Sequence, residues 1–348
     1  MSTDDLPLKN LQLKQVTHDL RSSVADLNTV NPWIGLLRFC TLGFVCLSLI
    51  VLAWLSQTSW GFVGYSAIAG FVYAIWFICT HDATHHTLTG WVWFDEALPR
   101  LMSYPMLWMH SVYAQIHRLH HGWNGTNLQD PERVQWTLEE YENASVWMKW
   151  YVRHQWQVDL FVLGGLGMIA KTIRHGWQFG KTIPAVRRAL LFDAIGIVLV
   201  QASFLTVALF TQHLWQYIIF WCILERVIGV VVQARDHLEH YGMWSQAPGH
   251  QLTQLYSSRN LTVHPIVGWL VGGLNYHSVH HAFPSIPFDQ LPEAFRRIES
   301  VLKQHDLPPM TVGCGYVKEV SRLSTQPSAI GTDQVDNLTG RYQMLNLS

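Results

Sequence analysis

The chain has 348 residues, of which 49% are hydrophobic and only 14% are charged. Ordinary soluble proteins carry about 25% charged residues, so the composition points away from that class. A formal net charge of −1 offers no basic surface for nucleic acid. The five cysteines are scattered without paired spacing, which argues against a disulfide framework, a zinc ribbon or an iron–sulfur cluster.

The N-terminal segment is polar and lacks the charged-then-apolar pattern of a cleaved signal peptide. The first apolar run is therefore expected to remain in the protein as a membrane span. It covers Phe39–Leu55 and can be extended back to Trp33. A second run, Trp60–Cys79, follows after four residues, so the two should form a helical hairpin.

A second pair of apolar runs follows later in the chain. The stretch Ala194–Leu224 contains no formally charged residue, and the trio Thr211-Gln212-His213 divides it. Because a helix rises about 1.5 Å per residue, about 20 residues cross a hydrocarbon core of roughly 30 Å. The sequence thus predicts four spans in two hairpins, at residues 33–55, 60–79, 190–210 and 214–232.

Two shorter apolar stretches, Trp91–Met109 and Leu160–Ala170, are broken by Pro, Gly or charged residues. We interpret them as interfacial or re-entrant pieces rather than spans. In the fourth predicted span, Glu225 and Arg226 are adjacent and should face the bundle interior or a polar cavity. A polar contact between spans is the favoured interpretation, and substrate lining is the alternative.

The basic residues are distributed asymmetrically about the spans. Neither short interspan loop holds a Lys or Arg, and all but two of the 23 lie in the N-terminal arm, the segment 80–188 and the segment 233–348. By the positive-inside rule these three segments, with both termini, are predicted to be cytoplasmic. The predicted fold is an all-α integral membrane protein with a helical cap at 80–188 and 233–310 on that side.

Eleven of the 19 histidines fall in four short clusters, and every cluster lies on the predicted cytoplasmic side. Members of a cluster spaced by three or four residues place their imidazoles on one face of a helix, whereas His86 points about 100° away from His85 and is expected to be structural or supporting rather than a ligand. The clusters are His81/His85/His86, His117/His120/His121, His237/His240 and His277/His280/His281. The predicted topology brings all four to one membrane face.

Such a set of imidazoles predicts a metal centre. Neutral imidazole binds Zn, Cu, Fe and Ni, and eight or nine ligands exceed what one ion can bind, so two ions are implied. A ligand set without thiolates disfavours structural zinc. Redox-active iron is the natural choice.

His81–His85, His117-x-x-His120-His121 and His277-x-x-His280-His281 resemble the three histidine boxes of the membrane fatty acid desaturase family. The flanking residues 272–276 and 283–287, together with 127–132 after the second box, are also similar to that family. The resemblance runs from about Phe71 to Leu307 and suggests a single domain over residues 1–348.

This resemblance implies two iron ions (Fe2+/Fe3+) that use O2 and two electrons to desaturate an acyl chain. The implied ligands are His81, His85, His117, His120, His121, His277, His280 and His281. A further family ligand follows the fourth span; His237 fits it best, and His240 is the competing candidate.

Three carboxylates adjoin the proposed ligands, namely Asp82, Asp236 and Glu239. A metal-bound histidine usually donates its other ring N–H to a carboxylate or carbonyl. We therefore expect at least one of these three to accept such a bond.

Other functions share this ligand pattern. A hydroxylase, ketolase or monooxygenase could use the same ligands, and a small non-lipid substrate remains compatible with the sequence. A metal transporter is a remote alternative, because its ligands should lie near the middle of the spans. Since the chain shows no haem-binding domain, flavin motif or ferredoxin-type Cys run, we expect electrons from a separate ferredoxin or cytochrome. The acyl or lipid substrate should come from the bilayer.

Overall fold

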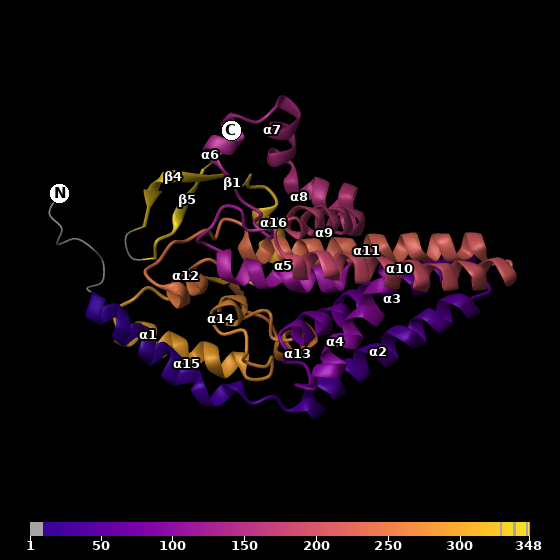
Figure 1. Cartoon of the computed structure of the whole chain (residues 1–348), viewed down its shortest axis with the longest axis horizontal. Helices are drawn as coiled ribbons and strands as arrows, with labels where there is room; N and C mark the ends of the chain where they lie inside the picture. The colour runs from indigo at the N-terminus through magenta and orange to yellow at the C-terminus, as the bar shows by residue number, and fades with distance from the viewer. Residues whose placement is uncertain (1–9, 328, 337–338, 346, 348) are drawn as a thin grey trace. The chain divides into compact units, whose positions relative to one another are not determined.

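The computed structural model describes residues 10–327, 329–336, 339–345 and 347 (Figure 1). The chain is mostly helical and separates into two compact units, each built from stretches that are distant in sequence. The membrane unit comprises residues 31–119 and 157–234, and the histidine-rich unit comprises residues 1–30, 120–156 and 235–348. Helices α5 (His110–Trp123) and α11 (Leu214–His240) carry residues of both units.

Four long apolar helices match the four predicted spans. They are α2 (Pro32–Leu55), α3 (Ser59–Thr84), α10 (Pro184–Phe210) and α11. Asn31 caps the start of α2 and Thr58 caps the start of α3, each with a side-chain oxygen that accepts a backbone N–H. Both α3 and α11 continue beyond their apolar runs, so that their last turns carry histidines. Continuous helix thus places histidine side chains directly at the ends of apolar helices.

A fifth stretch within the described residues, Gln155–Gly180, is also long and apolar enough to cross a membrane. It comprises α8 (Gln155–Gln157), the π-helix η3 (Val158–Leu163) and α9 (Gly164–Gly180). The backbone turns at Gly164, whose φ of 54° is in the left-handed region that favours glycine. The structure therefore interrupts this stretch where the sequence predicts a re-entrant or interfacial piece.

Side chains of α11 satisfy the backbone groups freed by the interruption. The Glu225 carboxylate accepts the N–H of Leu166 at 2.8 Å, and Arg226 donates to the carbonyls of Phe161 and Val162 at 3.3 Å. Gln233 donates to the Gly164 carbonyl at 3.2 Å. Irregular backbone inside a membrane requires such partners. The favoured interpretation of Glu225 and Arg226 as polar contacts between apolar segments agrees with this geometry.

Tryptophans mark the ends of the apolar helices. Trp33 at the start of α2, Trp60 at the start of α3 and Trp215 at the start of α11 are all at least 70% exposed. Trp177, near the end of α9, is 65% exposed. Tryptophan is enriched where a membrane meets water, so these positions are typical of helices that enter a bilayer.

The remaining helices of the membrane unit connect the spans. Within the described residues they are α4 (Val92–Ser103) and the short 3-10 helix η2 (Tyr104–Met106). Asp193 of α10 accepts the Tyr104 hydroxyl at 2.9 Å and the N–H of Val112 at 3.0 Å. This buried carboxylate thereby fixes the first turn of α5, which carries the second histidine box.

The histidine-rich unit packs around its own apolar core. Helices α1 (Asn10–Val24) and α15 (Leu291–Gln304) lie side by side, with Val16 and Leu20 in the same cluster as Ile298 (Figure 1). The other helices of this unit in the described residues are η1 (Ala25–Asn28), α6 (Leu138–Glu142), α7 (Val146–Arg153), α12 (His250–Tyr256), α13 (Pro265–Leu270), α14 (His277–Ala282) and α16 (Tyr316–Leu323).

The prediction of an all-α fold is wrong in this unit. A three-stranded sheet has the order β1 (Trp136–Thr137), β4 (Ala329–Val335), β5 (Tyr342–Leu345), with β1 parallel and β5 antiparallel to β4. A second pair, β2 (Asn260–Leu261) and β3 (Val312–Gly313), is parallel. Most of these strands are too short to give a detectable alternation of polar and apolar residues.

Candidate metal centre

Three of the predicted ligands lie together in the membrane unit. His81 is in the last turn of α3, His85 caps that helix, and His117 projects from α5. The Nε2 atoms of His81 and His117 are 3.2 Å apart, and the ring of His85 lies 5.1 Å from that of His81 and 5.2 Å from that of His117. One nitrogen from each histidine falls within 4.8 Å of the others, a spacing that suits a shared metal ion.

Charged and aromatic neighbours position these three histidines. Asp82 forms an ion pair of 2.6 Å with Arg38 of α2, and both side chains are buried. The other oxygen of Asp82 lies 3.5 Å from Nδ1 of His81. On the opposite side, Tyr113 stacks on His117 with ring centroids 5.1 Å apart. Arg38, charged within an apolar helix, thus holds the carboxylate beside the first histidine.

In the histidine-rich unit, the ring nitrogens of three more histidines converge. His240 Nε2 lies 3.2 Å from His120 Nε2 and 3.0 Å from His277 Nε2. Two nitrogen ligands about 2.1 Å from one metal ion and at right angles to each other are about 3.0 Å apart. The separations therefore fit imidazoles that share an ion.

The opposite ring nitrogens of these histidines support the same interpretation. His120 Nδ1 donates to Asp130, whose two oxygens each lie 2.9 Å away, and His240 Nδ1 faces the Ser257 carbonyl at 3.4 Å. A neutral imidazole has one N–H, so a donated Nδ1–H leaves a lone pair at Nε2. With both Nδ1 atoms donating, the two Nε2 atoms 3.2 Å apart would share either a proton or a metal ion.

Asp130 also raises the pKa of His120. Burial alone would lower the pKa of His120, but the carboxylates of Asp130 and Glu132 raise it to about 9. The same two carboxylates would stabilise a metal cation at Nε2, which must displace this proton because only the neutral ring binds a metal. Asp130 was not among the three carboxylates expected to hold a ligand, although it lies in the 127–132 segment noted after the second box.

His281 and its neighbours form the remainder of the group. His121 and His281 stack with ring centroids 4.3 Å apart, and the ring of His280 lies 4.9 Å from that of His121. His281 donates Nδ1–H to Gln254 at 3.0 Å, whereas its Nε2 is buried without a hydrogen-bond partner among the described residues. A buried nitrogen of this kind is suited to a metal ion.

The environment keeps two histidines of the third box neutral. Burial lowers the pKa of His277 and of His281 well below the usual value, and neighbouring imidazoles lower both further. Because only neutral imidazole can bind a metal, both residues are in the binding form at physiological pH.

The competing candidates after the fourth span occupy different surroundings. His237 packs against Trp156 at a ring distance of 5.0 Å and against Tyr241 at 6.2 Å. His240 instead belongs to two groups with metal-ligand spacing, one with His120 and His281 and one with Glu239 and His277. Asp236, also expected near a ligand, is half-buried and belongs to no such group within the described residues.

The end of α11 is held from both sides. Arg259 donates to the carbonyls of Leu238 and Tyr241, and Gln135 donates to the carbonyl of His240. The carbonyls of Leu238 and His240 belong to the last turn, where no donor within the helix remains for them, and that of Tyr241 follows directly. The contacts stop the last turn from fraying and fix the direction of Glu239 and His240.

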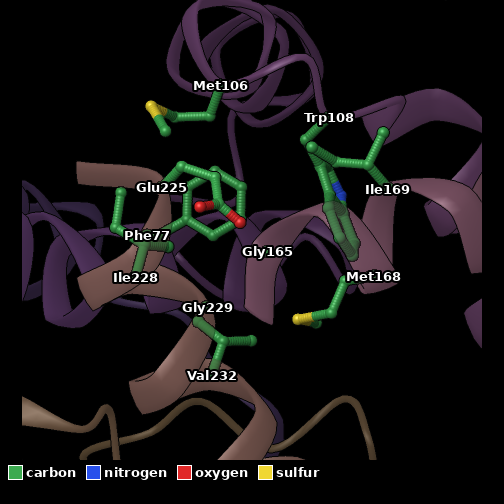
Figure 2. Close-up of a pocket in the computed structure, with 10 residues that line it drawn as sticks. All are labelled: Phe77, Met106, Trp108, Gly165, Met168, Ile169, Glu225, Ile228, Gly229 and Val232. Carbon is green, nitrogen blue, oxygen red and sulfur yellow. The ribbon is translucent and has the colours of Figure 1, made fainter. Parts of the chain in front are cut away.

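A small apolar pocket lies within the membrane unit (Figure 2). Its lining residues are Phe77, Met106, Trp108, Gly165, Met168, Ile169, Glu225, Ile228, Gly229 and Val232. Phe77 precedes His81 by one turn of α3, and Trp108 contacts the ring of Tyr113 that stacks on His117. The pocket wall is thus continuous with side chains that support the histidines of this unit.

Comparison with known proteins agrees with this geometry. The model of the family described as fatty acid desaturase matches residues 58–313. This chain belongs to the fatty acid desaturase family. The match covers all three histidine boxes and most of both units, and the enzyme is an oxidoreductase of the desaturase class.

Curated relatives of this desaturase are similar over most of its length. It is 22% identical over 327 residues to an sn-1 oleoyl-lipid 12-desaturase of Arthrospira platensis, covering 91% of this chain and 88% of the relative. It is 22% identical over 314 residues to the same enzyme of Picosynechococcus sp., covering 83% of each chain. An acyl-lipid (9-3)-desaturase of Physcomitrium patens is 22% identical over 243 residues, covering 66% of this chain and 46% of that protein.

Proposed function

We propose that this desaturase holds two iron ions with histidines from both units and uses them to introduce a double bond into an acyl chain. The single observation that carries the proposal is the set of converging ring nitrogens in each unit, 3.0 to 3.2 Å apart. Helix α5 links the two sets, because His117 lies three and four residues before His120 and His121 on one continuous helix. Family membership supports iron as the metal.

The proposed ligands are the eight histidines of the three boxes together with His240. His240 is preferred to His237 because its Nε2 points at His120 and His277, whereas the ring of His237 contacts Trp156 and Tyr241. We infer that His237 packs beneath the centre and supports the last turn of α11.

Bound iron would supply the oxidising power that removes two hydrogens from adjacent methylenes when O2 and two electrons are available. The surrounding residues have separate tasks. Asp130 and Gln254 hold the Nδ1–H groups of His120 and His281, so that each ring keeps one orientation. Burial of the histidines excludes water that would otherwise compete with the substrate for the oxidant.

We propose that the apolar pocket borders the path of the substrate and takes up part of its hydrocarbon chain. Its walls are aliphatic and aromatic apart from Glu225, which is bonded to Leu166, so it suits a hydrocarbon chain better than a small polar molecule. Two of the relatives are named as oleoyl-lipid desaturases. We infer that the substrate of this chain is likewise an acyl chain of a membrane lipid.

We further propose four full spans, with Gln155–Gly180 entering the membrane and returning on the same side. Gly165 lies against Glu225 near the middle of α11, whereas Gly180 lies against Arg187 in the first turn of α10. A fifth full crossing would put His240 on the opposite side of the membrane from His81, which a shared centre forbids. The distribution of Lys and Arg supports a cytoplasmic location for the centre and both termini.

Electrons would come from a separate ferredoxin or cytochrome in the cytoplasm. We infer that both compact units function as one desaturase domain, because the family match at 58–313 takes in segments of each.

The proposal is tested by expressing the chain with a working electron donor in a host of defined lipid composition. Lipid mass profiling should reveal acyl chains lighter by two hydrogens, and a variant with His280→Ala should make none. Products heavier by one oxygen would assign the chain to oxygen insertion. An unchanged lipid profile would contradict the acyl-desaturase proposal.

A further inference from the structure

The carboxylate of Glu239 faces the same space as the ring nitrogens of His240 and His277. It belongs to the last turn of α11, is 3% exposed, and places Oε2 3.4 Å from Nε2 of His277. Glu239, His240 and His277 each offer one ligand atom, and these three atoms lie within 4.8 Å of one another. The centre therefore contains a carboxylate that an all-histidine ligand set does not require.

The side of the ring on which a carboxylate lies distinguishes a supporting residue from a ligand. Asp130 contacts His120 at Nδ1, behind the ring, and Gln254 contacts His281 at Nδ1 in the same manner. Glu239 instead approaches His277 at Nε2, the nitrogen that also faces Nε2 of His240 at 3.0 Å. A carboxylate on that side faces the location a metal ion would take and can bind it together with the two imidazoles.

We propose that Glu239 is an anionic ligand of one of the two metal ions and forms, with His240 and His277, a two-histidine one-carboxylate set. This rests on the proposed function in requiring a metal centre. Such a set with open positions is typical of non-haem Fe(II) proteins that activate O2. A carboxylate lowers the net charge of its ion by one and stabilises the ferric state, so the two ions of the centre become chemically unequal.

A purely structural role for Glu239 makes a different prediction. Arg235 donates to Glu239 at 3.0 Å, and the two residues are four apart on α11. If this ion pair were the function of Glu239, loss of either partner would have the same effect. If Glu239 binds a metal, Arg235 only steadies its carboxylate.

The experiment compares purified full-length variants loaded with Fe(II) anaerobically, with iron per chain measured by elemental analysis. Glu239→Gln should lose one of two irons, because an amide is a poor ligand. Glu239→Asp and Glu239→His, which keep a metal-binding atom, should retain both. Arg235→Met should also retain both irons. Asp130→Asn is the matched control, because it alters a carboxylate that contacts Nδ1 of a histidine rather than the metal. It should bind iron more weakly but still hold two irons at saturation.

Two results would overturn the inference: two irons in Glu239→Gln, or loss of iron in Arg235→Met equal to that in Glu239→Gln. X-ray absorption at the iron edge gives a second measurement, since the average number of oxygen neighbours per iron should be lower in Glu239→Gln than in the wild type. Failure of the proposed function is separable, because it would appear as absence of iron, or of desaturated lipid, in the wild type.

Discussion

His240 occupies the point where the ring nitrogens of two histidine boxes meet, and this single residue distinguishes two ligand assignments. Its Nε2 is 3.2 Å from that of His120 and 3.0 Å from that of His277. Replacing it removes the nitrogen common to both contacts. His237, three residues earlier on the same helix, supplies a matched control because it packs on Trp156.

We predict that His240→Ala lowers bound iron from two to one or fewer per chain, whereas His237→Ala retains two. The loss follows from removing a ligand, and the control removes a ring of equal size from the same helical turn. Elemental analysis of the purified variants measures both. Iron loss confined to His237→Ala would reverse the assignment.

Asp130 acts through His120 rather than on a metal. Its two oxygens accept the Nδ1–H of His120, and the residue is buried. Removal of such a partner typically weakens metal binding by about 10–100-fold. We therefore expect Asp130→Asn to lower iron affinity by that factor in chelator competition. Glu140→Gln, which affects a carboxylate bonded to Arg133 nearby, should leave the affinity unchanged.

At the scale of elements, the interruption of the apolar stretch at Gly164 requires its backbone to lie close to the backbone of α11. A Cβ at Gly229 of α11 would collide with the backbone of Gly164 and Gly165. A Cβ at Gly64 of α3 would meet nothing within 4 Å. The two positions form a matched pair, because both glycines lie within apolar helices and gain the same helix propensity on conversion to alanine.

Gly229→Ala should therefore destabilise the protein by about 1–3 kcal/mol, the usual cost of overpacking, while Gly64→Ala should be neutral or stabilising. Thermal unfolding of the detergent-solubilised protein measures the difference. Equal midpoints of thermal unfolding for the two variants would mean that the interrupted segment around Gly164 does not pack against α11 at Gly229.

The long helices and the histidine boxes could be predicted from the sequence, because uncharged runs and three- or four-residue spacings are local signals. The starts of α2 and α3 fall within one residue of the predicted starts, whereas α3 and α11 extend five and eight residues past the predicted ends at Cys79 and Val232. Those last turns are polar and lie outside any apolar run. Histidine spacing signals their helical character, but it does not locate their ends.

Contacts between segments distant in sequence could not be predicted. The partner of His120 is ten residues away in a loop, and Glu239 faces a histidine 38 positions later. The small sheet joins β1 to strands almost 200 residues further on, with no periodic pattern in a two-residue strand. Side-chain direction at the end of α11, which separates His237 from His240, depends on Arg259 and Gln135.

At the scale of the whole molecule, the proposed topology places the centre and the two interspan loops on opposite sides of the membrane. The loops at Gln57 and Gln212 hold no Lys or Arg, whereas the histidine boxes lie in segments rich in Lys and Arg. In sealed inverted vesicles of a variant whose five native cysteines are replaced by serine, cysteine at Gln57 or Gln212 should resist an impermeant thiol reagent that labels cysteine at Gln304. Labelling of all three positions from one side would contradict the four-span arrangement.

The account depends most on one centre with two iron ions, built from histidines that the sequence separates by up to 200 residues. Iron content combined with Mössbauer spectroscopy of the oxidised, purified protein tests it most directly. We predict two irons per chain, giving spectra of an exchange-coupled diferric pair. One isolated iron per chain, or a stoichiometric metal other than iron, would contradict the account.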